Sequence, residues 1–275
     1  MKKFIIWIIL LIFLSIIPGI ILSPYKIDVV FNTIENKSIS KEFDDYTILF
    51  FSDLLLKDSS DIEYLESAVN KINNLYPDIV IFGGDLFYNA DIFQFNEEQL
   101  DKINTLLESI NPKYSKYYVF GDNDLSSDNT MNITSTIMDE ANFECIENEL
   151  ITVNINKESI NLVGLPNNIN GTINDEIIDN LNNSYNIVVS HTPDTINDYN
   201  ISNIDYFIAG HTLGGQVYLP IIGSLVNIKS EFINGTHQIS DTTISISNGL
   251  GSITNHKYRF LANKQIVLYT IKTTY

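Results

Sequence analysis

The chain has 275 residues, of which 44% are apolar and 18% charged, so it can bury the core of one large domain or at most two domains. Acidic residues outnumber basic residues 34 to 16, and a formal net charge of -18 argues against a surface that binds DNA or RNA. The single cysteine, Cys145, excludes an internal disulfide framework and a multi-cysteine metal cluster. The composition predicts an acidic globular domain with no nucleic-acid partner.

An apolar run covers residues 4–22, which carry no charged side chain. A helix of this length is about long enough to cross a hydrocarbon layer of about 30 Å. Lys2 and Lys3 precede the run, which favours a cytoplasmic N-terminus. We therefore predict that residues 1–24 form a transmembrane anchor and that the protein crosses the cell membrane once. This helix would be its contact with the bilayer, and the domain would lie outside the cytoplasm.

Two alternatives to this interpretation stay open. A cleaved signal peptide is disfavoured because the run is longer than usual and Ser23-Pro24 makes a poor cleavage site. The opposite orientation is not excluded, since Lys26, Lys37 and Lys41 follow the run.

The rest of the chain alternates between strand-like and helix-like patterns. We expect residues 25–45 to form a linker with an edge strand at 27–31, and residues 46–275 to form one domain. Short apolar runs typical of strands occur at 46–51, 78–82, 117–120, 143–146, 151–155, 159–165, 186–189, 206–209, 243–247 and 265–271. Amphipathic helices are predicted after a capping box at Ser60, after Asn96, and at 133–141 and 172–181. This alternation indicates an α/β layered fold.

Polar side chains follow five of these strands directly, and in open α/β sheets the carboxyl ends of strands line the ligand crevice. Carboxylates and imidazoles at such an edge suit a divalent metal such as Zn, Mn or Fe. A lone aspartate after a strand is more often a helix cap, but five such turns in register are hard to explain that way. The turns are Ser52-Asp53, Gly83-Gly84-Asp85, Gly121-Asp122-Asn123-Asp124, Ser190-His191 and Gly210-His211.

In this order the turns resemble the motifs D-x-H, G-D, G-N-H-D/E, H and G-H-x-H of the calcineurin-like metallophosphoesterases. The segment from Gly210 to Gln216 is similar to G-H-T-H-G-G-Q of the bacterial membrane-anchored branch, and Arg259-Phe260 looks like that branch's C-terminal turn. The resemblance covers about residues 46 to 272. It implies a four-layer αββα sandwich of two mixed sheets around a two-metal site, and phosphoester hydrolysis by metal-bound hydroxide.

The chain departs from the family pattern at four positions. Leu55 and Leu213 stand where the family has metal-binding histidines, Asp122 replaces the bridging Asn, and Asn123 replaces the catalytic His beside its acidic partner Asp124. By resemblance, the first metal keeps only Asp53 and the shared Asp85. The second metal keeps a complete set, which is Asp85, Asp122, His191 and His211.

We therefore expect one bound divalent metal and no second one. The loss of a dication and the change of Asn to Asp make the pocket about three charges more negative, and Asn123 cannot protonate a leaving group, which alone costs roughly 10²–10⁴-fold. The first hypothesis is a weak or non-hydrolysing protein with one metal. The others are a single-metal hydrolase that uses Asp122 or Asp124 for proton transfer, and an extracytoplasmic binding module. Ordinary two-metal hydrolysis is the least favoured hypothesis.

The remaining candidates are weaker. A position near a bilayer suggests a phosphorylated or lipid-like small ligand, and protein partners stay unassigned. His237 and His256 are expected on the surface, and Cys145 is expected to be a small buried residue in a strand.

Overall fold

The computed structural model describes residues 26–89, 95–174, 176–182, 184–219, 221–226, 228–253 and 257–274, together with Trp7. The predicted anchor, apart from Trp7, and His256 lie outside these residues. In the described part of the chain, no helix combines the length and the apolar character needed to cross a bilayer.

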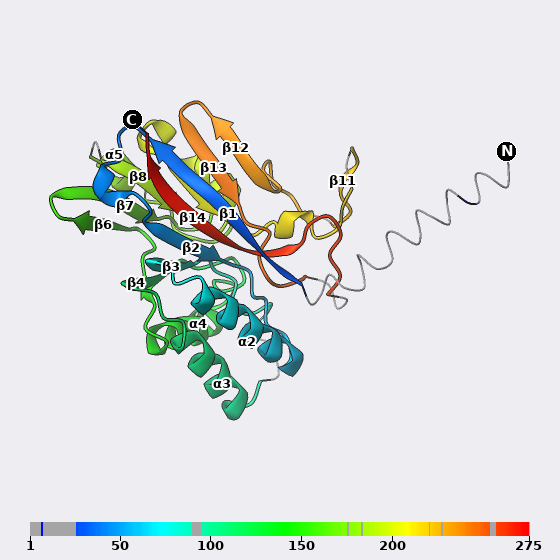
Figure 1. Cartoon of the computed structure of the whole chain (residues 1–275). Coiled ribbons are helices and arrows are strands. Elements are labelled where there is room, and N and C mark those ends of the chain that lie inside the picture. The colour runs from blue at the N-terminus through cyan, green and yellow to red at the C-terminus, as the bar shows by residue number, and fades with distance from the viewer. Residues whose placement is uncertain are drawn as a thin grey trace.

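Two mixed sheets, each with six described strands, form the centre of the fold (Figure 1). In the first, β14 lies between β1 and β2, pairing parallel with β1 and antiparallel with β2, and the remaining pairs are parallel. Its order is β1 (Ile27–Asn36), β14 (Lys264–Thr273), β2 (Thr47–Phe51), β3 (Ile79–Phe82), β4 (Ser115–Tyr118) and β5 (Glu144–Cys145).

The second sheet has antiparallel pairs at both edges and parallel pairs in its centre. Its order is β12 (Gly235–Ile239), β13 (Thr242–Ile246), β9 (Tyr206–Ala209), β8 (Tyr185–Val189), β7 (Glu158–Gly164) and β6 (Glu149–Ile155). A small hairpin of β10 (Tyr218–Leu219) and β11 (Gly223–Ser224) projects from the same domain (Figure 1).

Three buried clusters separate the layers. Along β2, alternate side chains point to opposite faces, so Leu49 packs toward the helices while Ile48 packs toward the other sheet. The helices α2 (Ser59–Asn74), α3 (Glu97–Glu108) and α4 (Asp128–Glu140) cover the first sheet (Figure 1). The outer face of the second sheet is covered by the short α5 (Glu176–Asp179) and the 3-10 turns η3 (Pro193–Asp198) and η4 (Ile201–Asn203). The mixed α/β class with two mixed sheets is confirmed, and the outer layer on the second sheet is thin.

Several elements differ from the sequence-based expectation. The segment expected as a linker carries the ten-residue strand β1, which lies at the edge of the first sheet. The cap of α2 is Asp58, not Ser60, because Asp58 accepts from Ser60 N while Asp61 closes the box. The helix expected at 172–181 is reduced to the four residues of α5. Cys145 in β5 is only partly buried, and His237 is half-buried with its Nε2 donating to Asn234 O.

Candidate metal centre

The polar turns singled out in the sequence converge where strands of the two sheets end side by side. Asp53 follows β2, Asp85 follows β3, and Asp122 lies in the turn after β4. His191 follows β8 and His211 follows β9 in the second sheet. The site is therefore shared between the sheets at their carboxyl edge, where parallel strands of α/β proteins present ligand-binding groups.

The backbone at this edge is folded into left-handed turns. Positive φ angles occur at Asp53 (54°), Leu55 (47°), Asp85 (63°), His211 (67°) and Leu213 (52°). Asp, Asn and His visit this region several times more often than other non-glycine residues. The two leucines therefore occupy conformations that Asp, Asn and His adopt more readily.

Two glycines let the turns approach each other. A Cβ on Gly84, whose φ is +88°, would lie 2.3 Å from the backbone nitrogen of Gly121. A Cβ on Gly121 would lie 2.0 Å from Oδ1 of Asp85. Any larger residue at either position would push apart the turns that carry Asp85 and Asp122.

Four side chains bring one ligand atom each into a compact group. One atom each of Asp85, Asp122, His191 and His211 lies within 4.8 Å of all the others, and no second group of three such residues occurs among the described residues. Nε2 of His191 lies 3.4 Å from Oδ2 of Asp85 and 3.1 Å from Oδ1 of Asp122. Nδ1 of His211 lies 2.8 Å from the same Asp122 oxygen and 3.2 Å from Nε2 of His191.

These separations fit a single small cation. Ligands at about 2.0–2.1 Å from a tetrahedral ion lie about 3.4 Å from each other, close to the observed values. Oδ1 of Asp122 has no hydrogen-bond partner among the described residues, although two imidazole nitrogens lie within 3.1 Å of it. Nitrogen and oxygen atoms that converge this closely, with Asp122 Oδ1 lacking a hydrogen bond of good geometry, are the arrangement expected of metal ligands.

The imidazole of His191 is held in a defined tautomer. Its Nδ1 lies 2.6 Å from the carbonyl oxygen of Gly83, which can only accept, so Nδ1 carries the proton. In the neutral form of the ring, the Nε2 lone pair is therefore the one that faces the two carboxylates. A backbone carbonyl behind a metal-binding histidine is the usual device that fixes its orientation.

In this site, interactions between charged groups shift the pKa values of His191 and Asp122 in the direction opposite to the effect of burial. Burial alone would lower the pKa of His191, but the carboxylates of Asp85, Asp122 and Asp53 outweigh it and raise that pKa well above its ordinary value. Burial likewise disfavours the charged form of Asp122, yet the two imidazoles hold its pKa below the usual range. Without a metal, the carboxylates therefore favour a proton on His191, and a divalent cation at the same place would displace that proton.

Asp53 lies beside this group. Its Oδ2 accepts from Ser52 Oγ at 2.5 Å and from the backbone N–H of His211 at 3.1 Å. Its Oδ1 is buried without a hydrogen-bond partner among the described residues and lies 3.9 Å from His191 Nε2. Burial raises the pKa of Asp53, and the neighbouring Asp85 adds to that increase, while His191 opposes it.

The two residues expected at the catalytic positions have other contacts. Nδ2 of Asn123 donates to Oδ2 of Asp85 at 2.5 Å, and the Asn123 backbone N–H donates to Oδ1 at 2.9 Å. Asp124 is fully buried, and its oxygens accept from the backbone N–H groups of Asp85, Gly121 and Leu86. These contacts disfavour the hypothesis that Asp124 transfers a proton to a substrate, since this carboxylate holds the two metal-site turns together.

Leu55 and Leu213 are both buried. A Cβ on Gly251 would lie 2.6 Å from the Cβ of Leu55, so Leu55 packs against the segment after β13. The backbone N–H of Leu55 donates to the carbonyl of Asp85. Leu55 and Leu213 therefore place hydrocarbon, not a donor atom, next to the turns that carry Asp53 and His211.

Sequence reasoning missed the role of Arg259, the only arginine of the chain. Its guanidinium is fully buried and donates to backbone carbonyls of four residues that lie around the site, Leu213, Asn248, Gly251 and Ala262. Burial lowers the pKa of Arg259 to about 10. The presence of one lone arginine in the chain was the signal that could have pointed to this role.

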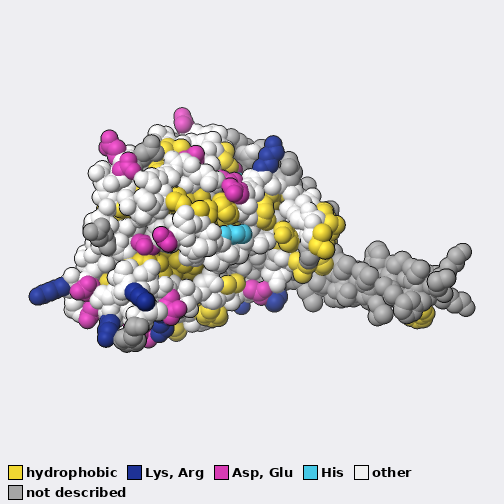
Figure 2. All heavy atoms as spheres, turned by 90° about the horizontal axis from the view of Figure 1, so that it is seen from above, with side chains coloured by type: hydrophobic (Ala, Val, Ile, Leu, Met, Phe, Trp, Pro, Cys, Tyr) yellow, Lys and Arg dark blue, Asp and Glu magenta, His cyan; other side chains and the backbone are white. Residues whose placement is uncertain are grey.

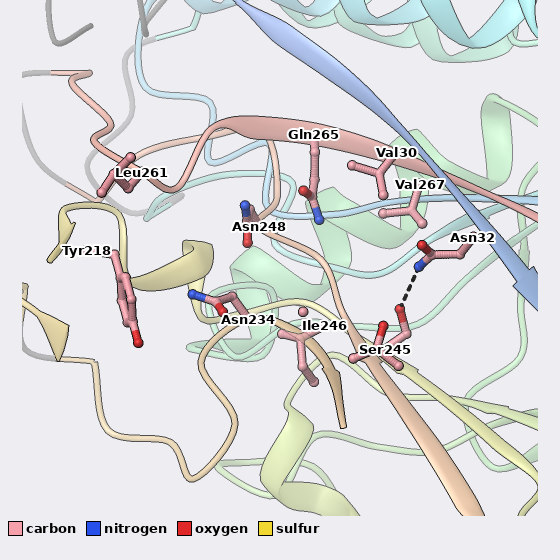
Figure 3. Close-up of a pocket in the computed structure, with 12 residues that line it drawn as sticks. Val30, Asn32, Tyr218, Asn234, Ser245, Ile246, Asn248, Leu261, Gln265 and Val267 are labelled. Atoms are coloured by element: carbon pink, nitrogen blue, oxygen red, sulfur yellow. Dashed lines mark hydrogen bonds between the residues drawn. The ribbon is translucent and has the colours of Figure 1, made fainter. Parts of the chain in front are cut away.

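A separate cavity of about 350 Å³ opens between β1, β14 and β13 (Figure 3). Its described lining carries no charged side chain and is rich in amides, among them Asn32, Asn234, Asn248 and Gln265. Asn32 donates to Ser245 Oγ, and Leu261 and Tyr218 lie at one side of the cavity (Figure 3). None of the residues that line this cavity belongs to the candidate metal centre.

The fold and the four-residue cluster define an α/β protein with metal-binding groups at the shared edge of two mixed sheets. Residues 46–215 match the family model of the calcineurin-like phosphoesterases. Because the match covers more than half of the chain, the chain belongs to that family.

Curated relatives of this chain are described as metallophosphoesterases. "Uncharacterized metallophosphoesterase YkuE" of Bacillus subtilis (strain 168) is 28% identical over 262 residues, covering 92% of this chain and 88% of the relative. "Uncharacterized metallophosphoesterase Cj0846" of Campylobacter jejuni is 26% identical over 265 residues, covering 94% of this chain and 68% of the relative. Among solved structures, TT1561 of Thermus thermophilus is similar with a TM-score of 0.46 and 11% identity, covering 78% of this chain and 97% of that one.

Proposed function

We propose that this chain is a membrane-anchored member of the family that holds one divalent metal instead of two and has weak or lost phosphoester hydrolysis. Asp85, Asp122, His191 and His211 would hold the ion, and Asp53 is a remnant of the first site. The donor set of carboxylates and imidazoles suits Zn, Mn or Fe. A divalent ion bound there would supply positive charge that neutralises phosphate oxygens.

One observation carries this proposal. The oxygen of Asp85 that faces His191 also accepts the side-chain amide of Asn123, while Leu55 and Leu213 are buried in the positions of the two missing ligands. Asp85 can therefore contribute to one ion, but the described residues offer no complete second set beside it. A single cation faces three neighbouring carboxylates, so a phosphate dianion meets a less positive pocket than in a two-metal site.

The residues at the catalytic positions support the same conclusion. Asn123 carries no titrating group, and Asp124 is buried beneath the turns that it holds. Asp122 lies at 2.8 Å and 3.1 Å from the two imidazoles, as a ligand would. Asp122 would thus be a metal ligand and Asp124 a structural residue, so neither is free to transfer a proton. This favours a pseudoenzyme or a binding module over a single-metal hydrolase that uses Asp122.

The ligand and the location follow from the same reasoning. A site with one cation would bind a phosphorylated or lipid-like small molecule through its anionic group. The apolar run at 4–22 supports anchoring in the cell membrane with the domain outside the cytoplasm.

Metal content tests the proposal. The full chain is purified in detergent and dialysed against buffer that contains trace divalent metal. Elemental analysis should then find about one divalent ion per chain. His191→Ala and His211→Ala should each lose the ion, whereas His237→Ala, outside the site, should keep it. Two tightly bound ions in the wild type would overturn the one-site proposal. Turnover of bis(4-nitrophenyl) phosphate that both histidine variants abolish would instead establish the single-metal hydrolase.

A further inference from the structure

Large apolar side chains are exposed together at one end of the domain. Ile221 is fully exposed, and Ile222 (70%), Leu225 (59%) and Leu261 (59%) keep more than half of their surface in contact with solvent. The first three belong to the β10–β11 hairpin and its end. Figure 2 shows apolar side chains gathered at the end of the domain from which this hairpin projects in Figure 1.

Hydrogen bonds join the two segments that carry these side chains. The backbone N–H of Tyr218 donates to the carbonyl of Phe260 at 2.9 Å, and the N–H of Phe260 donates to Gln216 O at 3.0 Å. Val217 and Phe260 form an isolated parallel bridge. One surface, which we call the hairpin patch, therefore contains Ile221, Ile222, Leu225, Tyr258 and Leu261.

The backbone at the tip of the hairpin is costly as well. Ile221 has a φ of 77°, a conformation that is a genuine outlier for a β-branched residue. A fully exposed isoleucine gains nothing from water that would offset such strain. Apolar patches of this kind on a soluble surface mark contacts with a partner or a membrane.

The preceding part of the chain indicates which partner covers the hairpin patch. The apolar run ends at residue 22, and five residues of extended chain from there to Ile27 span at most about 18 Å. Ile27 pairs with Lys264, which follows Leu261 by three residues. A bilayer that holds residues 4–22 must therefore lie near the hairpin patch.

We propose that the hairpin patch inserts into the interface of the bilayer that holds the N-terminal segment. Isoleucine and leucine then leave water for the acyl boundary, and Tyr258, apolar with a polar tip, suits the head-group level. Because the hairpin directly follows the segment of His211, this contact holds the metal centre at the lipid–water boundary. The inference goes beyond the proposed function. It depends on the proposed N-terminal anchor only for the identity of the bilayer that the hairpin patch contacts.

A depth measurement on the full chain tests this contact. In a Cys145→Ser background, Ile222→Cys is labelled with an environment-sensitive fluorophore, and the protein is reconstituted into phosphatidylcholine–phosphatidylglycerol vesicles. The matched control is Lys157→Cys, an exposed position in the turn between β6 and β7 at the opposite end of the domain (Figure 1). The label at 222 should emit at shorter wavelength and be quenched by lipids with a nitroxide on the acyl chain, and the label at 157 should show neither effect.

Trp7, the only tryptophan, reports separately on the anchor. Quenching at both Trp7 and position 222 supports the inference. Quenching of Trp7 alone leaves the anchor in place and overturns the inference, as does a shorter-wavelength label at 222 that lipid nitroxides do not quench, which would indicate a protein contact. Quenching at 222 alone supports bilayer contact and rejects the anchor, and quenching at neither position rejects both.

Discussion

The side-chain amide of Asn123 donates a hydrogen bond to the carboxylate of Asp85, on an oxygen that could otherwise give its lone pair to a cation. Nδ2 of Asn123 lies 2.5 Å from Oδ2 of Asp85, and the backbone N–H lies 2.9 Å from Oδ1. A neutral side chain thus compensates part of the charge of Asp85 without any second ion. This contact joins the turn after β4 to the turn after β3.

Removing the hydrogen bond between Asn123 and Asp85 should destabilise the metal-free protein more than the metal-bound protein. Asn123→Ala leaves Asp85 without a charge-assisted hydrogen bond, at a cost of about 2 kcal/mol. We expect the midpoint of thermal unfolding to fall by about 5 °C in chelator and by less with excess divalent metal, since the ion then neutralises Asp85. Near-ultraviolet circular dichroism of the detergent-solubilised chain measures both.

Asn197→Ala, at an exposed position, serves as the control and should leave the midpoint unchanged. An equal fall with and without metal would show that Asn123 contributes packing rather than charge compensation at Asp85.

Restoring the family residues should restore activity. The variant combines Leu55→His, Leu213→His, Asp122→Asn and Asn123→His. Two imidazoles then occupy positions with a left-handed backbone conformation, which histidine adopts more readily than leucine. A titrating group also stands beside Asp124. We expect two ions per chain and a gain of at least about 10²-fold in hydrolysis of bis(4-nitrophenyl) phosphate.

The matched control keeps Asn123 and carries the other three changes. It should bind two ions but hydrolyse about 10²-fold more slowly than the fourfold variant, because general acid catalysis is missing. If the fourfold variant binds two ions and gains no activity, the cleft has diverged beyond these positions.

Arg259 should be the most sensitive position of the loops around the site. In Arg259→Lys, one ammonium group cannot reach the carbonyls of Leu213, Asn248, Gly251 and Ala262 at once, so buried acceptors lose their donors. Loss of two such bonds costs about 3 kcal/mol, which lowers the unfolding midpoint by roughly 10 °C. Lys157→Ala, an exposed change of a cation, should leave the midpoint within error; equal stability of both variants would contradict the role of Arg259.

Stability should depend on pH through Lys264. This side chain lies over the ring of Tyr64 at 3.9 Å, and burial, followed by repulsion from Arg259, lowers its pKa to about 7. Between about pH 7 and pH 10 the unfolded chain binds a proton that the folded chain does not, so this group makes folding more favourable as the pH rises.

Lys264→Met removes that contribution. The variant should exceed the wild type in unfolding midpoint at and below pH 7, and the difference should shrink by at most about 1.4 kcal/mol for each pH unit above it. Lys229→Met, at an exposed lysine, provides the comparison. A difference between wild type and Lys264→Met that is constant from pH 6 to about pH 10 would contradict the lowered pKa.

Much of the strand pattern could be predicted because β2, β3, β8 and β9 are buried on both faces and form continuous apolar runs in the sequence. The cap of α2 could not, since Asp58 and Ser60 both start a capping pattern, and the choice depends on Asp61, which also binds Lys257 from a distant loop. Strand β12 was missed because its side chains are largely exposed and polar.

The candidate site shows the same division. The convergence of Asp85, Asp122, His191 and His211 follows from strand order, because the ends of parallel strands share one edge. The contacts of Asn123 and Asp124 depend on the path of a single turn, and the reach of Arg259 depends on how four loops fold back. Residue types at strand ends therefore predicted which side chains converge, whereas the path of the loops decided which further contacts they make.

The position of β14 between β1 and β2 has a consequence for synthesis. The strand β1 pairs only with residues 264–273, so the ribosome must release the chain as far as β14 before that edge can form. During translation, β1 and one edge of β2 therefore have no hydrogen-bonded partner strand until β14 is made. If the N-terminal run has already inserted into a membrane, these unpaired edges lie beside that membrane. Chain-termination mutations that remove β14 should thus leave two open strand edges, which are prone to aggregate rather than to fold with a shorter sheet.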